Sequence, residues 1–236
     1  AERLKKLTMP EGTTGDQRTI VAEATPVSQG YGLIKIGEIV DTIEVFGIDP
    51  PSYDGVTGFS ESLYWTPQRF RDQQERLRSE RDEAPEPAWI DQRIEQLQTL
   101  EQQPFDKYGM TMQPPDHWQR DGKTLDGVVT GIEVNPFPVR GRDGQYEVER
   151  SLISGRVILT LVPVSDAGLV VEPNVRQFIV VNEFKSGLYE LDKNRAYIPF
   201  AVMQGMMQMD AYEAVDDTGV PTGQTVPART SMLAIR

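Results

Sequence analysis

The segment VNEFKSGLYELDKNRAYIPFAVMQGM, residues 181–206, is the most patterned stretch of the chain. Its apolar start predicts a strand that ends near Phe184, and ELDKN predicts a turn after Tyr189. RAYI then predicts a short strand, and Pro199 predicts the start of a helix that runs to about Met209. The segment therefore predicts a unit made of a strand, a turn, a second strand and a helix.

The residues of this segment are expected to have folding roles, because it contains no evident nucleophile, metal cluster or phosphate-binding loop. Gly187 is expected to permit the turn, since glycine adopts backbone conformations that other residues avoid. The side chains expected to pack in the core are Phe184, Leu188, Tyr197 and Ile198.

Strands are also predicted on both sides of the segment. Residues 19–50 predict three strands, in TIVAEATPV, GLIKIG and IVDTIEVFGI, and further strands are predicted in GVVTGIEV, GRVILTLVPV, RQFIVVNEF and SMLAIR. Asp143 and Gly144 predict a hairpin turn, whereas the Gly-rich stretch 216–225 is expected to be a loop. The predicted fold class is α+β, a β-rich module plus a mixed α/β part in a single domain over residues 1–236.

Residues 60–126 differ in composition and predict a helical insertion into the β-rich body. Thr66 is expected to cap a helix that starts at Pro67 and ends near Arg81. A second helix is predicted from Ala88 to Gln102 because apolar residues recur on one face. That face carries Ile90, Ile94, Leu97 and Leu100. The two helices predict an antiparallel hairpin, followed by a proline-containing loop over residues 103–124.

The composition indicates a folded protein and excludes some classes of partner. The chain has 236 residues, 36 acidic and 24 basic, for a formal net charge of −12. Nucleic acid is not expected as a partner, because phosphate binding needs a basic surface. Cysteine is absent, so disulfides and thiolate chemistry are excluded. No apolar run is long enough to span a bilayer, and both ends read like cuts through a longer protein.

Catalysis, metals and cofactors are not expected from the motifs. His117 is the only histidine, and we interpret it as an ordinary loop residue. Gly30 and Gly32 lack the third glycine of a dinucleotide fingerprint, so we interpret them as turn glycines. Acidic pairs suited to glycoside hydrolysis exist on paper, but they are expected by chance among 36 acids. These pairs are Asp216 with Asp217, Glu190 with Asp192, and Glu147 with Glu149.

Two groups of side chains leave alternatives open. Methionines could form a soft-metal or greasy-ligand patch, but their helical spacing favours core packing. This group comprises Met203, Met206, Met207 and Met209. Aromatic side chains of the insertion could form a partner-binding patch, although packing of the insertion onto the body is the favoured alternative. This second group comprises Tyr64, Trp65, Phe70, Trp89, Phe105 and Trp118.

The segment FKSGLYELDKNRAYIPFAVMQGM resembles a characteristic stretch of bacterial ABC transporter permeases of the FtsX/LolC/LolE/MacB type. In that family the pattern is similar to F-K-[ST]-G-[ML]-Y-E-x-D, followed by a strand that ends near proline and a short helix. IEVFGIDP, residues 43–50, and the strands within residues 154–184 resemble further family segments in the same order. The similarity covers most of residues 20–210, except roughly residues 60–126.

The resemblance implies an extracytoplasmic (periplasmic) domain, held at the outer face of the bacterial inner membrane between two transmembrane helices. It implies a MacB-like periplasmic core that faces a second permease copy or paralogue and binds no nucleotide. ATP would be hydrolysed by a separate ATP-binding subunit. The favoured interpretation is a lipoprotein-releasing-like permease, which would recruit a periplasmic carrier, whereas an efflux relative would contact an adaptor protein.

Two departures from the family pattern limit this interpretation. The helical hairpin of residues 66–102 is not part of that pattern, and the chain stops where relatives continue with another helix and strand. Two alternatives stay open: an efflux or envelope-hydrolase-activating permease domain, and a secreted carbohydrate-active or carbohydrate-binding domain. The second alternative predicts a cleft that holds two carboxylates.

Overall fold

The computed structural model describes residues 21–81, 87–102, 119–120, 123–136, 139–140, 146–147, 151–163, 172–215 and 220–236. It contains both helices and strands, which confirms the α+β class. The helices are α1 (Pro50–Thr57), η2 (Phe59–Ser62), α2 (Pro67–Arg81), α3 (Ala88–Glu101), η4 (Ile132–Val134), α4 (Tyr189–Asn194) and α5 (Phe200–Met206). The longer strands are β1 (Ala24–Ile36), β2 (Ile39–Ile48), β5 (Asp126–Gly131), β8 (Arg156–Leu161), β9 (Asn174–Phe184), β10 (Arg195–Pro199), β12 (Pro221–Val226) and β13 (Met232–Ile235). Shorter ones are β3 (Gln119–Arg120), β4 (Lys123–Thr124), β6 (Val139–Arg140), β7 (Tyr146–Glu147) and β11 (Tyr212–Val215).

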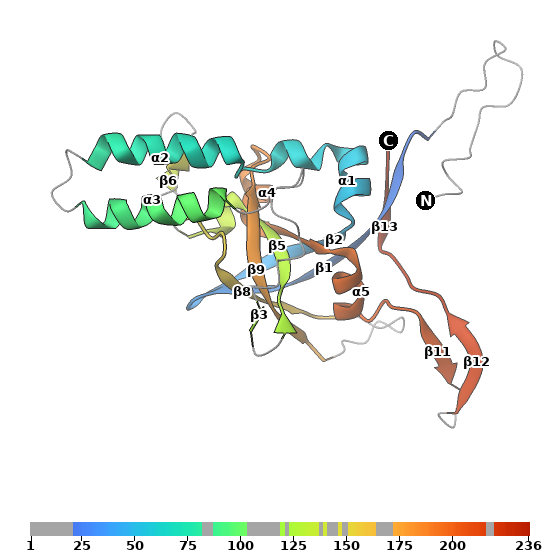
Figure 1. Ribbon diagram of the computed structural model, residues 1–236. Coiled ribbons are helices and arrows are strands. Elements are labelled where there is room, and N and C mark those ends of the chain that lie inside the picture. Colours follow the sequence, from blue (N-terminus) through green and yellow to red (C-terminus); the bar gives the residue numbers. More distant parts are fainter. Residues whose placement is uncertain are drawn as a thin grey trace, which may run out of the picture.

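Six strands close into a barrel in the order β1, β2, β10, β5, β9 and β8, and β8 pairs back with β1 (Figure 1). The closing pairs run from Gly32 opposite Leu161 to Lys35 opposite Ile158. A Cβ at Gly32 would lie 2.0 Å from the Thr160 carbonyl oxygen, so a glycine is required where the two strands approach. The first residues of β1 extend beyond the barrel and pair with β13.

Apolar side chains fill the barrel, because alternate residues of each strand point inward. The interior cluster comprises Ile34, Ile43, Val45, Val128, Leu152, Val157, Leu159, Leu161, Phe178, Val180, Ala196, Ile198, Met203 and Met206. Helix α5 closes one end of it: a Cβ at Gly47 would lie 2.2 Å from Cβ of Met203. Met203 and Met206 are therefore core residues, which confirms the packing interpretation of these two methionines.

The intervening outward residues of β2, β10 and β9 form a second core under the helices. Phe46, Val181 and Tyr197 belong to this second core, together with Trp65 and Phe70 from the region before and within α2. The wall of the barrel that carries these residues is therefore covered by helices. On the outer face of β1, β2 and β9, by contrast, large side chains remain exposed: Tyr31, Leu33, Val40 and Val175.

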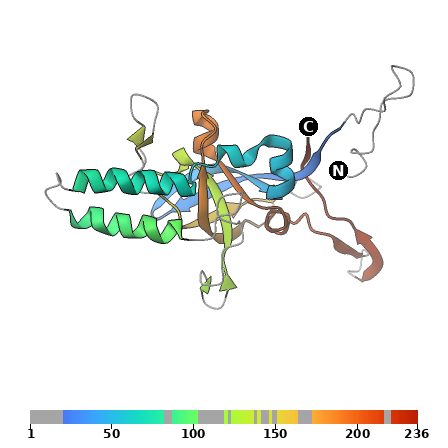
Figure 2. The same ribbon diagram turned by 45° about the horizontal axis from the view of Figure 1, so that its top comes forward.

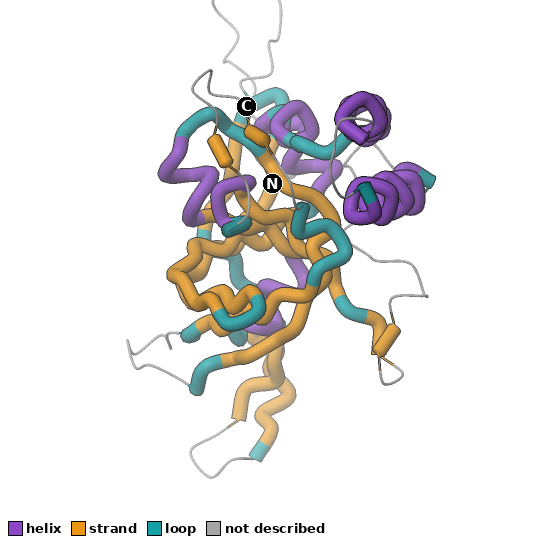
Figure 3. The backbone as a smooth tube through the Cα atoms, turned by 90° about the vertical axis from the view of Figure 1, so that its left-hand side faces the viewer, coloured by secondary structure: helices purple, strands orange, loops and turns teal. Residues whose placement is uncertain are grey.

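The predicted helical hairpin is present. Helices α2 and α3 pack against each other and project from the barrel, as two views show (Figures 1 and 2). Seen from the side, both helices lie end-on next to the strands (Figure 3). The Thr66 hydroxyl accepts a hydrogen bond from the Arg69 backbone N–H at 3.2 Å, which confirms the predicted N-cap. Strands β6 and β7 pair antiparallel on either side of the predicted DG turn, and Asp143 and Gly144 themselves lie outside the described residues.

Residues 19–50 do not form the three predicted strands. Strand β1 runs without a break through Gly30 and Gly32, so the interpretation of these residues as turn glycines is wrong. Both positions instead allow close contacts inside a strand: a Cβ at Gly30 would lie 2.8 Å from the Met203 methyl group. A glycine within a strand-like sequence can mark either a bend or a place where another part of the chain comes close. At Gly30 and Gly32 it marks the close approach.

Three further expectations need correction, and one helix was not predicted. GIDP ends β2 as predicted, but Asp49 also caps α1, a helix that was not predicted. ELDKN forms the short helix α4 rather than a turn, and β12 occupies part of the predicted loop 216–225. Leu188 is 62% exposed and does not pack in the core, whereas Phe184, Tyr197 and Ile198 are buried as predicted.

Candidate functional site

The aromatic residues predicted to bind a partner occupy different environments. Trp65 and Phe70 are 1% and 0% exposed and stack with ring centroids 5.0 Å apart, so these two follow the packing alternative. Tyr64 is partly buried, with the Arg69 guanidinium 4.4 Å from its ring centroid. Trp89 is 53% exposed, and partner contact stays a prediction for it. Phe105 and Trp118 lie outside the described residues.

The buried aromatic pair lies next to the place where the hairpin is attached to the barrel. We call this place the joint, and define it as residues 62–65 together with residues 182–185. The Tyr64 N–H donates to the Glu183 carbonyl at 2.7 Å, and the Lys185 N–H donates to the Ser62 carbonyl at 2.8 Å. The chain leading into α2 thus pairs with the end of β9, and Leu63 forms an isolated bridge with Phe184.

The side chain of Asn182 strengthens the joint by binding the main chain of Trp65 twice. Its Oδ1 accepts from the Trp65 N–H at 3.0 Å, and its Nδ2 donates to the Trp65 carbonyl at 3.0 Å. Both bonds are buried, so each satisfies a backbone group that water does not reach. The Asn182 side chain therefore pairs with Trp65 as the main chain of a neighbouring strand would, and it fixes the start of the hairpin.

A fully buried carboxylate, Glu183, lies at the centre of the joint. Its Oε2 accepts from Trp65 Nε1–H at 2.5 Å, and its Oε1 accepts from Asn135 Nδ2 at 2.9 Å. Burial raises the pKa of Glu183 to about 7, and hydrogen bonds from Trp65, Asn135 and the Leu152 backbone N–H offset part of that rise. The positive charge of Arg93 on α3 lowers it further. Glu183 thus joins four segments of the chain.

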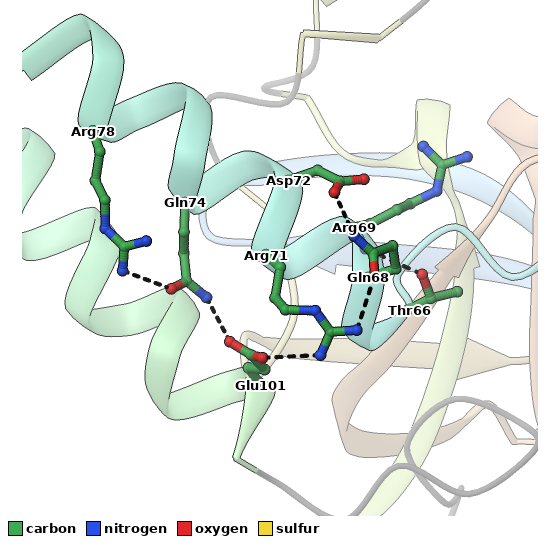
Figure 4. A network of polar contacts seen from close by, with 8 residues as sticks. All are labelled: Thr66, Gln68, Arg69, Arg71, Asp72, Gln74, Arg78 and Glu101. Atoms are coloured by element: carbon green, nitrogen blue, oxygen red, sulfur yellow. Dashed lines mark hydrogen bonds and ion pairs between the residues drawn. The ribbon is translucent and has the colours of Figure 1, made fainter.

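Beyond the joint, polar side chains hold α2 and α3 together (Figure 4). Glu101 accepts from Arg71 Nη1 at 3.2 Å and from Gln74 Nε2 at 2.8 Å, and Arg78 Nη2 donates to Gln74 Oε1 at 3.3 Å. Arg81 and Asp91 form an ion pair at 2.6 Å between α2 and α3. We call this set of contacts the polar ladder; it keeps the two helices in register.

The loop after the joint is held in one conformation by a buried carboxylate. Asp192 is 1% exposed, and its side chain accepts from the Ser186 N–H and hydroxyl, both at 2.7 Å, and from the Gly187 N–H at 3.2 Å. Gly187 has φ +85°, which confirms the predicted role of this glycine in the turn. The loop presents Leu188 and Tyr189, which are 62% and 50% exposed. Asp192 is thus engaged in loop structure, not paired with Glu190 in a cleft.

Other predicted candidates fall largely outside the described part of the chain. His117, Glu149, Asp216 and Asp217 are among the residues that the structure does not describe. Within the described ranges, no group of three or more His, Cys, Asp and Glu residues could hold a metal ion. In the same ranges, no helix is long and apolar enough to cross a membrane.

Asn182 and Glu183 were not identified from the sequence as functional residues. The signal that could have found them is two consecutive polar residues inside the apolar run FIVVNEF, since buried polar groups need specific partners. Comparison with known proteins found no matching family model and no matching curated sequence.

Proposed function

We propose that the chain is an extracytoplasmic domain of a bacterial ABC transporter permease of the FtsX/LolC/LolE/MacB type. In this proposal it is a MacB-like periplasmic core at the outer face of the inner membrane. It converts ATP-driven motion of membrane helices into the handling of a lipophilic substrate or a partner protein. The domain itself makes and breaks no bond, and ATP is hydrolysed by a separate subunit.

The observation that carries the proposal is the position of the segment that resembles the family, residues 184–206. This segment leaves the joint, forms the loop held by Asp192, supplies strand β10 between β2 and β5, and ends in α5, which closes one end of the barrel. A segment that lies at such a position typically holds the fold together. Its likeness to the permease segment therefore supports a likeness of the whole domain.

The path of the main chain is compatible with a domain that is inserted between two membrane helices. The Ala22 N–H donates to the Arg236 carbonyl at 2.9 Å, and the Arg236 N–H donates to the Glu23 carbonyl at 2.9 Å. The two ends of the described body thus lie side by side at the β1–β13 pair. Two neighbouring membrane helices could hold such a body at one point.

The mechanical role requires a body that moves as a unit. The closed barrel and the joint supply such a body, because a force applied at the β1–β13 pair reaches the hairpin through continuous β pairing and the buried contacts of Trp65. The hairpin projects from the barrel and is then available to a partner (Figure 1). The exposed side chains of α2 are charged or polar, which suits a protein partner better than the apolar interior of a membrane.

The test is to purify the full-length product of the gene from its native membranes with an affinity tag. We expect it to be extracted only with detergent, and to bring down an ATP-binding subunit in stoichiometric amount. Recovery from the soluble fraction without such a subunit would overturn the proposal. A variant of the ATP-binding subunit that cannot bind ATP is the control for nucleotide-dependent association.

The same preparation separates the lipoprotein-releasing role from the alternatives. A lipoprotein carrier that binds the full-length complex and not a complex lacking residues 67–101 would support lipoprotein release through the hairpin. Binding of an adaptor or an envelope hydrolase in its place would favour the efflux or hydrolase-activating role.

A further inference from the structure

Part of the outer wall of the barrel leaves large apolar side chains in contact with water. These side chains come from three strands: Tyr31 and Leu33 from β1, Val40 from β2 and Val175 from β9, which are 66%, 43%, 54% and 62% exposed. The wall under the helices, by contrast, shares a core with them. Antiparallel strands usually carry polar residues on the side that faces water. The apolar character of this part of the wall therefore needs an explanation.

The strand register brings the exposed side chains together. Leu33 of β1 lies opposite Thr160 of β8, and Thr160 lies opposite Val175 of β9, so the three form one row across the strands. Val40 lies diagonal to Leu33 across the β1–β2 pair. Tyr31 precedes Leu33 by two residues on the same strand and points to the same side. We call this set the barrel face: Tyr31, Leu33, Val40, Thr160 and Val175.

The largest side chain of the barrel face is held in place by a polar network. The Tyr31 hydroxyl donates to Glu44 Oε1 at 2.9 Å, and Gln29 Nε2 donates to the Tyr31 hydroxyl oxygen at 2.9 Å. Arg195 donates to Glu44 Oε2 through Nε at 3.1 Å and through Nη2 at 2.8 Å. A tyrosine that is exposed but already fixed loses little side-chain freedom on binding. It is therefore suited to anchor a protein interface.

The charges on this side of the barrel nearly cancel, although the chain as a whole is acidic. Arg195 is bound to Glu44, Lys35 lies 3.8 Å from Glu38, and Arg156 is exposed at the start of β8. Three positive charges against two negative charges leave one positive charge. The formal net charge of the chain is −12, so two copies repel each other over most of their surface, but not here. An anionic lipid surface would instead require a cluster of unpaired basic residues.

The size of the barrel face fits the centre of a protein interface. Its four large side chains leave roughly 400 Å² accessible to water, which is in the range of the largest apolar patches on single chains, and such patches are often functional. A standard interface buries about 800 Å² on each partner, and a polar rim supplies a large part of that area. The neighbouring polar side chains of Thr42 and Gln177 are available for such a rim.

We propose that the barrel face is the surface through which two copies of this chain associate about a two-fold axis. In such a dimer the same residues meet from both copies, so a face that is apolar and nearly neutral is complementary to itself. Tyr31 of each copy packs against the apolar row of the other copy. The inference concerns the chain itself and does not depend on the proposed function.

Analytical ultracentrifugation of the 236-residue chain tests the association. We expect a reversible equilibrium between monomer and dimer. Leu33→Glu should raise the dissociation constant at least about tenfold, because it buries an unpaired carboxylate in the contact. Val175→Glu, on another strand of the barrel face, should do the same. Leu188→Glu is the matched control at an exposed position outside the face, and it should leave the constant unchanged.

Three results of these measurements would overturn the proposal. The first is a chain that stays monomeric up to about 1 mM. The second is a dimer that Leu33→Glu and Val175→Glu do not weaken, although circular dichroism shows that both variants are folded. The third is binding of the monomeric chain to vesicles of anionic lipid that Leu33→Glu abolishes, since this would assign the barrel face to a lipid surface.

Cross-linking locates the contact independently of these variants. The chain has no cysteine, so Leu33→Cys and the control Leu188→Cys each introduce a single thiol. A short bismaleimide should join two copies of Leu33→Cys and should leave Leu188→Cys monomeric. Cross-linking at position 188 and not at position 33 would place the interface elsewhere and contradict the proposal.

Discussion

The barrel and the hairpin are held in different ways. The barrel is filled by apolar side chains from six strands and α5, so its stability is spread over many contacts, each of which is small. The hairpin shares an apolar core with the barrel wall, and its attachment adds the buried polar contacts of Asn182 and Glu183 at the joint. Buried polar contacts are costly when one partner is lost. From this difference we expect the hairpin to be more sensitive than the barrel to a single change at the joint.

The largest effect is expected from a cavity in the barrel. Leu159 is 0% exposed, and Leu159→Ala should lower the free energy of unfolding by about 2 to 5 kcal/mol. Because the hairpin depends on the barrel, both should unfold together, and denaturant unfolding followed by circular dichroism and tryptophan fluorescence measures this. Leu188→Ala, at a 62% exposed position, is the control and should change stability by less than about 0.5 kcal/mol. Persistence of the hairpin after barrel unfolding would contradict this dependence.

A change at the joint should separate the two regions. Asn182→Ala leaves the buried N–H and carbonyl of Trp65 without their partner, at a cost of roughly 2 to 3 kcal/mol. Exchange of the Trp65 amide and the first turn of α2 should accelerate, while the β1–β2 ladder stays protected. Asn194→Ala, at an exposed position, should leave both regions unchanged. Equal acceleration in the barrel would remove the distinction between the two regions.

A change in the loop after the joint should lower stability slightly and should not release the hairpin. Gly187 has φ +85°, and a Cβ there would meet nothing within 4 Å, so the cost of Gly187→Ala is conformational and about 1 kcal/mol. Thermal unfolding measures the cost, and Gly187→Asn should be milder because asparagine tolerates this conformation better. If Gly187→Ala released the hairpin, the joint would have to be extended to include the loop.

The smallest effect is expected in the polar ladder. The pair between Arg71 and Glu101 is 3.2 Å apart and partly exposed, so Arg71→Ala should cost about 0.2 to 1 kcal/mol, and less at high salt. Urea unfolding at low and high ionic strength measures this, with Gln92→Ala on the exposed face of α3 as the control. A salt-independent cost above 2 kcal/mol would show that the ladder, and not the joint, is the main support of the hairpin.

Local patterns in the sequence were sufficient to predict several elements. Ile90, Leu97 and Leu100 recur at helical spacing, so α3 was predicted, and Thr66 before Pro67 marked the start of α2. The apolar runs of β8 and β9 were equally informative. In each case the signal lies within a few neighbouring residues of the chain.

Features that depend on distant contacts could not be predicted in the same way. Glycine is needed at positions 30 and 32 only because Met203 and Thr160, from distant parts of the chain, come close to them. The joint likewise forms between residues separated by 117 positions, as in the bond from Trp65 to Asn182. Leu188 was expected to pack because it is apolar, but Asp192 holds its loop away from the core.

The position of the domain relative to the membrane tests the central claim most directly. The chain has no cysteine, so Leu188→Cys introduces a single exposed thiol into it, and Leu159→Cys introduces a buried one as the control. We predict that, in spheroplasts with an intact inner membrane, a membrane-impermeant maleimide labels the full-length protein at Leu188→Cys. Labelling only after the cells are lysed would place this surface on the cytoplasmic side and contradict the account.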